Sequence, residues 1–305
     1  MLDVTVCLPL SEAQRQRLVA VAAAAGCSVR FQEENEPCGS AIVFGNPSPS
    51  VLAANRALRW LQLESVGFGE YAALDWTRPG GTAQVTNLAG FFAEPVAQSA
   101  LAGILAWCRG IGRLALMKER REWLGDPLRE ELRLLTGATV VLFGYGAINK
   151  RLEELLEPFR CRIAAFSRTS MPEALDRALA EADVVVATVP DTPATRGLFD
   201  SARIARIRKG ALFCNFGRGT LVDDEALAAA LMKGRLGGAV IDVTREEPLP
   251  ASHPFWHCPN TLLTQHSGGG TGGEVDRKID VFLANLSRFR SGAPLMGLVD
   301  FSRGY

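Results

Sequence analysis

A glycine-rich turn stands where an apolar run passes into a helical pattern. The run covers Thr139–Phe143 and the helical pattern covers Lys150–Glu157. Glycines in such a turn allow a tight bend and let a pyrophosphate approach the backbone, where the N–H groups of a helix N-terminus bind it. Plain strand-to-helix connectors also contain G-x-G, but the placement between a strand and a helix favours a cofactor site. The residues expected to bind a dinucleotide here are Gly144, Tyr145, Gly146, Ala147 and Ile148.

The end of the next predicted strand indicates which dinucleotide is bound. In such folds an acid about 20 residues further on binds the ribose 2′-hydroxyl of NAD, whereas an arginine accommodates the 2′-phosphate of NADP. This strand ends in Ser167-Arg168-Thr169, without an acid. A guanidinium pairs with phosphate oxygens, and two hydroxyls can donate to them. We therefore expect NADP to be preferred over NAD; the alternative is that Arg168 is a solvated strand end.

One pattern suggests a metal, the H-x3-H spacing of His253 and His257 followed by Cys258. No second pair of ligands accompanies it, and the neighbouring prolines indicate an irregular loop, so a structural role is favoured. The seven cysteines form no C-x-x-C pair and mostly lie in apolar stretches. We interpret them as reduced packing residues.

The overall charge excludes several classes of partner. Lys+Arg and Asp+Glu both number 33 in the 305 residues, so no net field attracts nucleic acid. The first residues carry no basic segment, and no stretch reaches the roughly 18 uninterrupted apolar residues of a membrane span. We expect a cytoplasmic protein without nucleic-acid or membrane partners.

These residues need a scaffold, and strand patterns alternate with helical patterns along the whole chain. Such alternation is typical of α/β architecture with parallel sheets. A helix over Glu12–Ala25, capped by Ser11, is expected near the start. The strands expected around it are Val4–Leu8, Ser28–Phe31, Ser40–Phe44 and Leu58–Leu63.

A second series of strands follows a long apolar helix predicted over Ala93–Met117 and a polar connector, Lys118–Leu135. Spacings of this length suit right-handed βαβ crossovers, so residues 92–276 are predicted to form a doubly wound Rossmann domain. A last helix is expected over Glu274–Arg290. The strands of this series are Thr139–Phe143, Arg162–Phe166, Asp183–Val189, Ala211–Asn215, Gly238–Val243 and Thr261–Thr264. The apolar surface of the Ala93–Met117 helix exceeds what one core needs, which predicts a homodimer with this helix in its interface.

Four further segments follow in chain order: Val189–Leu198, Asn215–Leu227, Asp242–Pro250 and Thr264–Gly269. Together with the glycine turn they resemble the D-isomer-specific 2-hydroxyacid dehydrogenases, a family that includes glyoxylate/hydroxypyruvate reductases and D-lactate, phosphoglycerate and phosphite dehydrogenases. Long motifs in a fixed order are far more specific than any one short motif. The resemblance implies an enzyme of class EC 1.1.1.- that interconverts a small 2-keto acid and a D-2-hydroxy acid with NAD(P)H.

The resemblance also implies a catalytic set of Arg218, Glu247 and His266. An imidazole titrates near working pH and suits a general acid and base. A carboxylate bonded to its other nitrogen would orient the ring and stabilise its charged form. A guanidinium would bind the substrate carboxylate and polarise the keto oxygen. Each residue alone would be better explained as an ordinary turn or loop residue, but together, at strand ends where ligands collect, they are predicted to be catalytic.

Further site residues follow from the same resemblance. The backbone amides of Val66 and Gly67 would hold the substrate carboxylate, and Asp242 would contact the nicotinamide carboxamide. The last helix would return to a smaller, flavodoxin-like domain made of residues 1–91 and 277–305. The other residues expected to bind the cofactor are Ser167, Arg168, Thr169, Val189, Pro190, Thr195, Phe216, Gly217 and Gly268.

The chain departs from the family pattern at three positions. Asn149 replaces the third glycine and puts close packing of the cofactor helix in question, Gln265 replaces the usual proline before the histidine, and Asp191 adds a carboxylate near the expected cofactor cleft. Two alternatives stay open: a dinucleotide-sensing or scaffold protein without turnover, which the complete catalytic set argues against, and a phosphite-type oxidoreductase. Variable loops of the smaller domain would shape the pocket for the substrate's side chain, so the sequence does not identify the keto acid.

Overall fold

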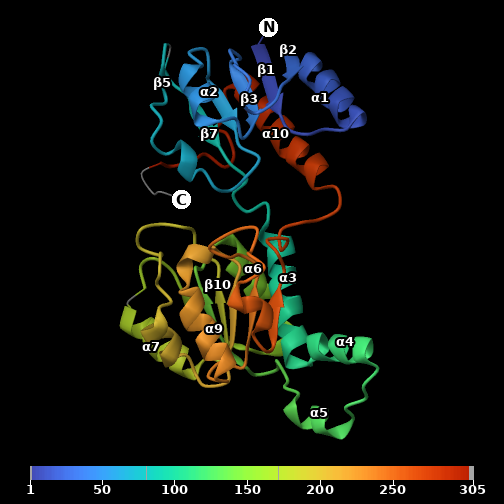
Figure 1. Cartoon of the computed structure of the whole chain (residues 1–305). Helices are drawn as coiled ribbons and strands as arrows, with labels where there is room; N and C mark the ends of the chain where they lie inside the picture. Colours follow the sequence, from blue (N-terminus) through green and yellow to red (C-terminus); the bar gives the residue numbers. More distant parts are fainter. Residues whose placement is uncertain (1, 80, 171, 302–305) are drawn as a thin grey trace. The chain divides into compact units, whose positions relative to one another are not determined.

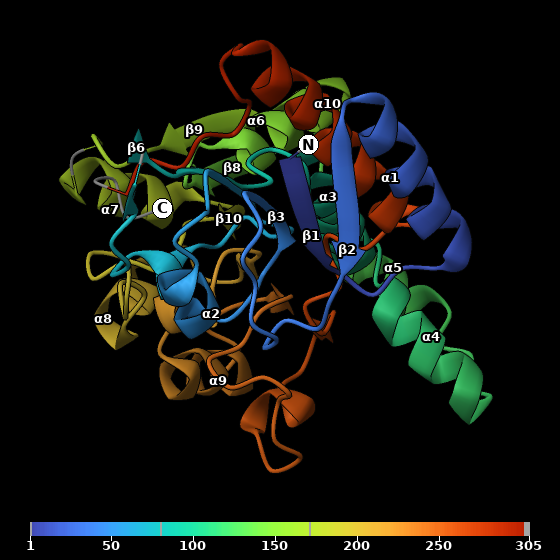
Figure 2. The same ribbon diagram turned by 90° about the horizontal axis from the view of Figure 1, so that it is seen from above.

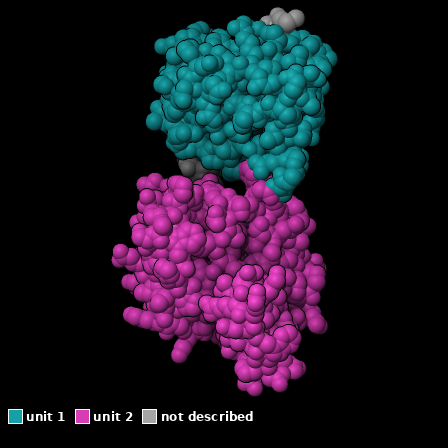
Figure 3. All heavy atoms as spheres, turned by 45° about the vertical axis from the view of Figure 1, so that its right-hand side comes forward, with its two compact units in different colours: residues 1–89, 271–305 teal, residues 90–270 magenta. Residues whose placement is uncertain are grey.

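A computed structural model of the chain describes residues 2–79, 81–170 and 172–301. The chain divides into two compact units (Figure 3). Unit 1 comprises residues 1–89 and 271–305, and unit 2 comprises residues 90–270. The chain thus passes between the units at residues 89/90 and 270/271. The boundaries expected from the sequence are close to these, at 91/92 and 276/277.

Unit 1 is built on a sheet of five parallel strands (Figure 1). Their spatial order, with the second strand outside the first, is that of flavodoxin-like folds. The prediction of a smaller flavodoxin-like sheet is therefore confirmed. In spatial order the strands are β2 (Cys27–Phe31), β1 (Leu2–Cys7), β3 (Ile42–Gly45), β4 (Trp60–Gln62) and β7 (Gln84–Thr86).

Two helices from opposite ends of the chain pack side by side on one face of this sheet (Figure 2). Helix α1 (Glu12–Ala24) begins at a capping box in which Ser11 and Gln14 bond each other's backbone amides. Helix α10 (Glu274–Ser291) buries Phe282 in the core of unit 1, stacked on Phe44 at 4.5 Å between ring centroids. Helix α10 therefore completes the core that the first strands begin.

Smaller elements complete unit 1. Helix α2 (Pro49–Ala54) packs on the opposite face of the sheet, where Val51 and Leu52 join a second apolar cluster. The others are the 3-10 turn η1 (Gly69–Tyr71) and the two-stranded ribbon of β5 (Thr77–Arg78) and β6 (Gly81–Thr82).

Unit 2 contains a sheet of six parallel strands. In spatial order they are β13 (Thr261–Leu263), β12 (Gly238–Ile241), β11 (Leu212–Asn215), β10 (Val184–Ala187), β8 (Thr139–Phe143) and β9 (Arg162–Phe166). Strands β9 and β10 follow β8 in the chain but lie on opposite sides of it, so the chain changes direction there. Ligands of doubly wound sheets bind outside the carboxyl ends of the strands at such a point. The predicted Rossmann architecture is confirmed.

Alternating side chains of the strands face two layers of helices in unit 2, as the pleat of a sheet requires. Val140 and Leu142 of β8 pack with α3 (Ala93–Cys108) and α6 (Ala147–Leu156). Val141 packs in the cluster on the other face. That face is covered by α7 (Pro172–Glu181), α8 (Ser201–Arg206) and α9 (Asp224–Met232), and the 3-10 turns of unit 2 are η2 (Glu157–Phe159), η3 (Gly219–Leu221) and η4 (Pro254–His257).

The single helix predicted over Ala93–Met117 is wrong. Helix α3 ends at Cys108, Gly110 takes a left-handed φ of +64°, and a new helix, α4 (Ile111–Arg120), begins after it. Within the described ranges, no single helix has the length and apolarity to cross a bilayer. The pair α3 and α4 taken together reaches that length and apolarity, but the two helices are bent by 64° relative to each other. Helix α5 (Asp126–Glu131) interrupts the segment predicted as a polar connector.

Candidate active site

The predicted site residues of unit 2 follow the carboxyl ends of its parallel strands. Because all six strands run the same way, these ends share one edge of the sheet. The turns at that edge are Gly144–Ile148 after β8, Ser167–Thr169 after β9, Val189–Thr195 after β10, Phe216–Arg218 after β11, Asp242–Glu247 after β12 and His266–Gly268 after β13.

The glycine turn after β8 fits a bound pyrophosphate. Gly144 has a φ of +91°, and a Cβ there would lie 2.7 Å from Cγ1 of Val189, so the turn admits only glycine. Gly146 caps the N-terminus of α6 without a side-chain hydrogen bond, and a Cβ there would meet nothing within 4 Å. Open space therefore lies before the amides at a helix N-terminus, the arrangement that binds phosphate. The hydroxyl of Tyr145, in the turn, donates to Glu153 of helix α6, and this bond raises the Tyr145 pKa.

Asn149, in place of the third glycine, ties the cofactor helix to the sheet. Its side chain is fully buried, and Nδ2 donates to the carbonyls of Phe143 at 3.3 Å, Gly144 at 3.1 Å and Val186 at 3.4 Å. These carbonyls belong to the carboxyl ends of β8 and β10. The substitution thus replaces close packing by hydrogen bonds across the two strands that flank the change of chain direction.

The turn after β9 is exposed and rich in hydroxyl groups. Ser167 Oγ lies 3.0 Å from Thr169 Oγ1, and the Ser167 amide donates to Ser170 Oγ at 2.9 Å. Arg168 is exposed between the two hydroxyls. Among the residues that follow β9 up to Ser170 there is no acid.

The turn after β10 is closed by its own side chains. Thr195 Oγ1 donates to the Pro190 carbonyl at 2.7 Å and accepts the Thr192 amide at 2.9 Å. Asp191 pairs with Arg196 through two contacts of 2.8 and 3.0 Å.

Asp191 also links this turn to the next one, since it accepts Thr220 Oγ1 at 2.9 Å. The hydrogen bond from Arg196 lowers the Asp191 pKa against the effect of burial, and Thr220 and the positive charges of Arg196 and Arg218 lower it further. The extra carboxylate therefore joins two loops instead of facing a ligand alone.

Arg218 is held between two glycines that the surrounding backbone requires. A Cβ on Gly217 would lie 2.5 Å from the Val189 carbonyl oxygen, and one on Gly219 would lie 1.9 Å from the Thr244 carbonyl carbon. Buried Asn215 spans the turn, because Nδ2 donates to the Arg218 carbonyl at 3.0 Å and Oδ1 accepts the Gly217 amide at 3.1 Å. The half-buried Arg218 therefore projects from a segment with little freedom.

His266 and Glu247 form a direct pair. His266 Nδ1 lies 2.7 Å from Glu247 Oε2, and Glu247 Oε1 accepts the Thr244 amide at 2.9 Å. Burial raises the Glu247 pKa, but hydrogen bonds from His266 and Thr244 and the charges of His266 and Arg218 outweigh it, so the pKa is lowered. The structure thus brings the His266 imidazole against the Glu247 carboxylate, as the sequence predicts for a general acid or base and the group that orients it, and Arg218 is close enough to act on the carboxylate electrostatically.

Asp242 holds the turn that carries His266 by accepting hydrogen bonds from it. The Asp242 carbonyl accepts the His266 amide at 2.6 Å, and its Oδ1 accepts Thr264 Oγ1 at 2.6 Å and the Gly268 amide at 3.0 Å. Gln265 and His266 both adopt a left-handed φ of +55°. The contact of Asp242 with the nicotinamide carboxamide stays a prediction, but its hydrogen bonds hold both sides of the histidine.

Val66 and Gly67 belong to unit 1, in the loop after β4, and both are exposed. Their carbonyls are hydrogen-bonded, from Asn87 Nδ2 to Val66 O at 2.7 Å and from Ser65 Oγ to Gly67 O at 2.8 Å. A loop held in this way presents its backbone amides in a fixed direction.

A family model described as the NAD binding domain of the D-isomer specific 2-hydroxyacid dehydrogenases matches residues 101–268. The chain belongs to this family. Over 285 residues it is 32% identical to an uncharacterized protein of Streptomyces coelicolor, covering 90% of this chain and 99% of that protein.

Two further relatives in the family have descriptive names. A glyoxylate/hydroxypyruvate reductase A of Yersinia enterocolitica is 26% identical over 288 residues, which cover 89% of each chain. A D-isomer specific 2-hydroxyacid dehydrogenase of Xanthobacter autotrophicus, solved with NADPH and MES, is 25% identical, with a TM-score of 0.82 over 100% of this chain and 99% of that one. Membership shows an oxidoreductase with a nicotinamide dinucleotide domain.

Several residues that hold the site carried no signal of their own in the sequence. Asn215, Thr264 and Thr244 act through bonds to backbone groups or to side chains across a turn. Asn215 could have been noticed as a polar residue that ends an otherwise apolar strand.

The H-x3-H pattern has packing partners. His253 Nδ1 accepts the Phe255 amide at 3.3 Å, and its Nε2 lies 3.5 Å from Asp224. Cys258 Sγ is 3.4 Å from the Pro254 carbonyl.

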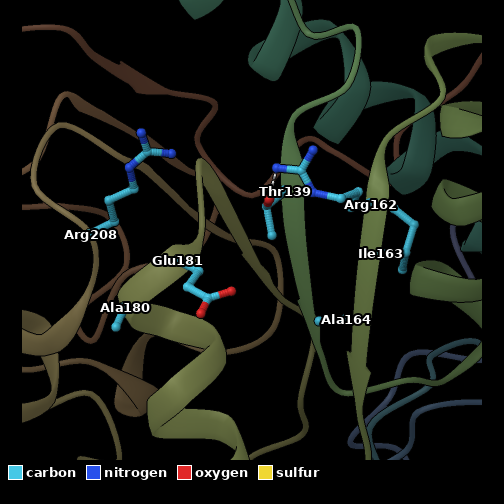
Figure 4. Close-up of a pocket in the computed structure, with 7 residues that line it drawn as sticks. All are labelled: Thr139, Arg162, Ile163, Ala164, Ala180, Glu181 and Arg208. Carbon is cyan, nitrogen blue, oxygen red and sulfur yellow. Dashed lines mark hydrogen bonds between the residues drawn. The ribbon is translucent and has the colours of Figure 1, made fainter.

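A pocket lies at the amino-terminal ends of β8 and β9, the opposite edge of the sheet from the residues predicted to be catalytic (Figure 4). Two of its cations have partners, since Arg162 donates to Thr139 Oγ1 at 2.8 Å and Arg208 pairs with Asp183. Its other lining residues are Ile163, Ala164, Ala180 and Glu181. This pocket is separate from the candidate active site.

Proposed function

We propose that the chain reduces a small 2-keto acid to the D-2-hydroxy acid with a nicotinamide dinucleotide. The observation that supports this best is the contact of 2.7 Å between His266 Nδ1 and Glu247 Oε2. It forms an oriented general acid on the same sheet edge as Arg218 and the glycine turn. The family membership supports the same class of reaction.

The protein's own groups would bind the keto acid and move a proton. With Glu247 ionised against Nδ1, the ring proton stays on that nitrogen and Nε2 is the atom that exchanges a proton with the substrate. During reduction Nε2–H protonates the keto oxygen as negative charge develops there, and in the reverse direction Nε2 accepts the hydroxyl proton. Arg218 stabilises the developing oxyanion, and the amides of Val66 and Gly67 bind the substrate carboxylate. A reduced nicotinamide, when bound, would supply the hydride that the carbonyl carbon needs.

The cofactor would be held by the turns after β8, β9 and β10, and NADP is preferred in this proposal. Arg168 lies between two hydroxyls at the end of β9, and the residues from there to Ser170 include no acid to bind a free ribose 2′-hydroxyl. The relative of Xanthobacter autotrophicus was solved with NADPH. Phe216, Gly217, Asp242 and Gly268 would line the nicotinamide end.

A spectrophotometric screen tests this function. Glyoxylate, hydroxypyruvate, pyruvate, phenylpyruvate and longer 2-keto acids are offered with NADPH and with NADH, to the wild type and to His266→Ala and Arg218→Ala. We expect turnover of at least one keto acid. His266→Ala should lower it about 100-fold or more and leave the fluorescence-measured Kd for NADPH unchanged. Arg218→Ala should raise KM and lower kcat, since the guanidinium binds the substrate before and during reaction.

Two outcomes would replace the proposal. If the wild type binds NADPH but reduces no keto acid, a dinucleotide-binding role without turnover takes its place. If it oxidises phosphite instead, the same residues serve a phosphite-type reaction. Wild-type rates in both variants would remove the catalytic assignment of His266 and Arg218.

A further inference from the structure

Two successive carbonyls in the loop after β4 of unit 1, those of Ser65 and Val66, point the same way. The Ser65 carbonyl accepts the Leu88 amide at 3.0 Å, and the Val66 carbonyl accepts Asn87 Nδ2 at 2.7 Å. Asn87 and Leu88 are consecutive residues directly after β7, so both carbonyls point toward the same short segment.

The direction of these carbonyls determines the direction of the next two amides. A trans peptide unit is planar, and its C=O and N–H point in opposite directions. The N–H groups of Val66 and Gly67 therefore point away from the 87–88 segment. Within the described ranges neither N–H donates to another group, and both residues are exposed. Two successive amides that point the same way form a concave site for an anion.

Asn87 has no freedom to release the Val66 carbonyl. It is 8% exposed, its Oδ1 accepts the Ala89 amide at 3.1 Å, and its own amide donates to the Gly297 carbonyl at 2.9 Å. A flip of the side-chain amide would break two bonds at once, because Oδ1 would face a carbonyl and Nδ2 would face an N–H. Gly297 packs against Asn87 so closely that a Cβ would lie 2.6 Å from the Asn87 carbonyl oxygen.

We propose that Asn87 is a positioning residue for the substrate carboxylate, acting by fixing the peptide between Val66 and Gly67 so that the Gly67 amide points at the anion. This inference rests on the proposed function, in which these amides bind the carboxylate. Among the described residues, the hydrogen bonds of Asn87 go to backbone groups of unit 1, so in this proposal Asn87 acts through the loop and not by contact with the substrate.

Asn87→Asp tests the role with almost no change of shape. The carboxylate presents an acceptor to the Val66 carbonyl, so the two oxygens repel and the peptide loses its fixed direction. We expect the KM for glyoxylate and the inhibition constant of oxamate, an unreactive carboxylate, both to rise about tenfold or more, as for one lost hydrogen bond to a charged group. The kcat should change less, since the carboxylate is bound equally before and during reaction. The Kd for NADPH should not change.

Asn55 provides a matched control in the same unit. It is 2% exposed, its Nδ2 donates to the Ser40 carbonyl at 2.9 Å, and its Oδ1 accepts the Ala57 amide at 3.0 Å. Asn55→Asp removes the same kind of bond, but that bond does not reach the 64–68 loop. We expect it to lower the melting temperature about as much as Asn87→Asp and to leave KM and the oxamate constant at wild-type values.

The outcomes separate this inference from the proposed function. Equal KM values for wild type and Asn87→Asp, with Arg218→Ala still raising KM, would overturn the role of Asn87 and leave the proposed function standing. An equal rise of KM in both Asn variants would also overturn it, because general destabilisation would then be the cause. If Asn87→Asp does not fold, Asn87→Ala takes its place, and an unchanged KM in that variant has the same meaning. A wild type that reduces none of the screened 2-keto acids and does not bind oxamate would remove the proposed function and the inference with it.

Discussion

His266 Nδ1 lies 2.7 Å from Glu247 Oε2, while the other oxygen of that carboxylate is held by the Thr244 amide. The carboxylate is thus fixed by backbone on one side and fixes the imidazole on the other. A substitution that keeps the shape of the Glu247 side chain and removes its charge therefore tests this pair most directly.

Glu247→Gln should change the pH dependence of keto-acid reduction. The Glu247 pKa is lowered in the folded protein, so the carboxylate is ionised across the neutral range and favours a protonated imidazole. Loss of this charge should move the basic limb of kcat/KM toward acid. A depressed carboxyl pKa means that the interaction is lost as the pH falls through it, so wild type and variant should converge at acid pH. Identical basic limbs would show that Glu247 only orients the ring.

Gln265→Pro should disable the histidine turn. Proline fixes φ near −65°, whereas Gln265 has a φ of +55°. We expect unfolding free energy to fall by more than about 1 kcal/mol, as for a proline placed where the native backbone excludes it, and turnover to fall with it. Gln265→Gly, which accepts a left-handed backbone, is the control and should keep both near the wild-type level. Urea denaturation together with steady-state rates checks the pair, and full activity of the proline variant would contradict the turn described here.

Arg168→Asp should invert cofactor choice. The change removes a phosphate partner and introduces repulsion, so NADPH binding should weaken by on the order of 1.5–3 kcal/mol while NADH improves relative to it. Arg162 begins the same strand, β9, at its opposite end. Arg162→Asp therefore carries the same charge change away from the site and should leave the ratio of the two Kd values unaltered. A wild type that already prefers NADH would refute the Ser-Arg-Thr interpretation.

A homodimer is expected, with its interface at α4 and the segment after it. Most of the apolar face of α3 is covered by the unit's own sheet, as Ala97, Ala100 and Ile104 are fully buried, so α3 alone no longer requires a partner. Helix α4 has no buried residue, and Leu116 is 58% exposed. Light scattering should give twice the chain mass of 32.8 kDa for the wild type. Leu116→Glu should shift the measured mass toward that of a single chain. A monomeric wild type at micromolar concentration would refute the prediction.

The strands and the turn residues that follow them could be predicted from the sequence, because both depend on the local pattern of apolar residues and glycines. The run Thr139–Phe143 is β8 in the structure, and the glycine turn follows it as predicted. Helix α3 was predicted too long because Gly110 interrupts an apolar pattern that continues beyond it, and apolarity alone does not reveal a left-handed residue.

Contacts between turns that are far apart in the sequence could not be predicted from a local pattern. The sequence marks Asp191 as an unusual carboxylate, but its bond to Thr220 joins residues that only the fold brings together. The sequence shows Gln265 as a departure from the family pattern, yet its left-handed backbone depends on the bonds that Asp242 makes to both sides of the turn. Asn87 and Asn215 resemble ordinary turn residues until their acceptors are known.

The return of α10 to unit 1 has a consequence for synthesis of the chain on the ribosome. Phe282 stacks on Phe44, and buried Asn285 donates to Gln62 at 3.0 Å, so this core needs residues made after all of unit 2. Domains made during translation generally fold from the N-terminus onward. Here the order is reversed: the nascent unit 2 has its whole core first. On the apolar face of β1, β3 and β4, α1 can pack early, but the part that α10 covers stays exposed until α10 is made, and this is the surface that a chaperone would have to shield.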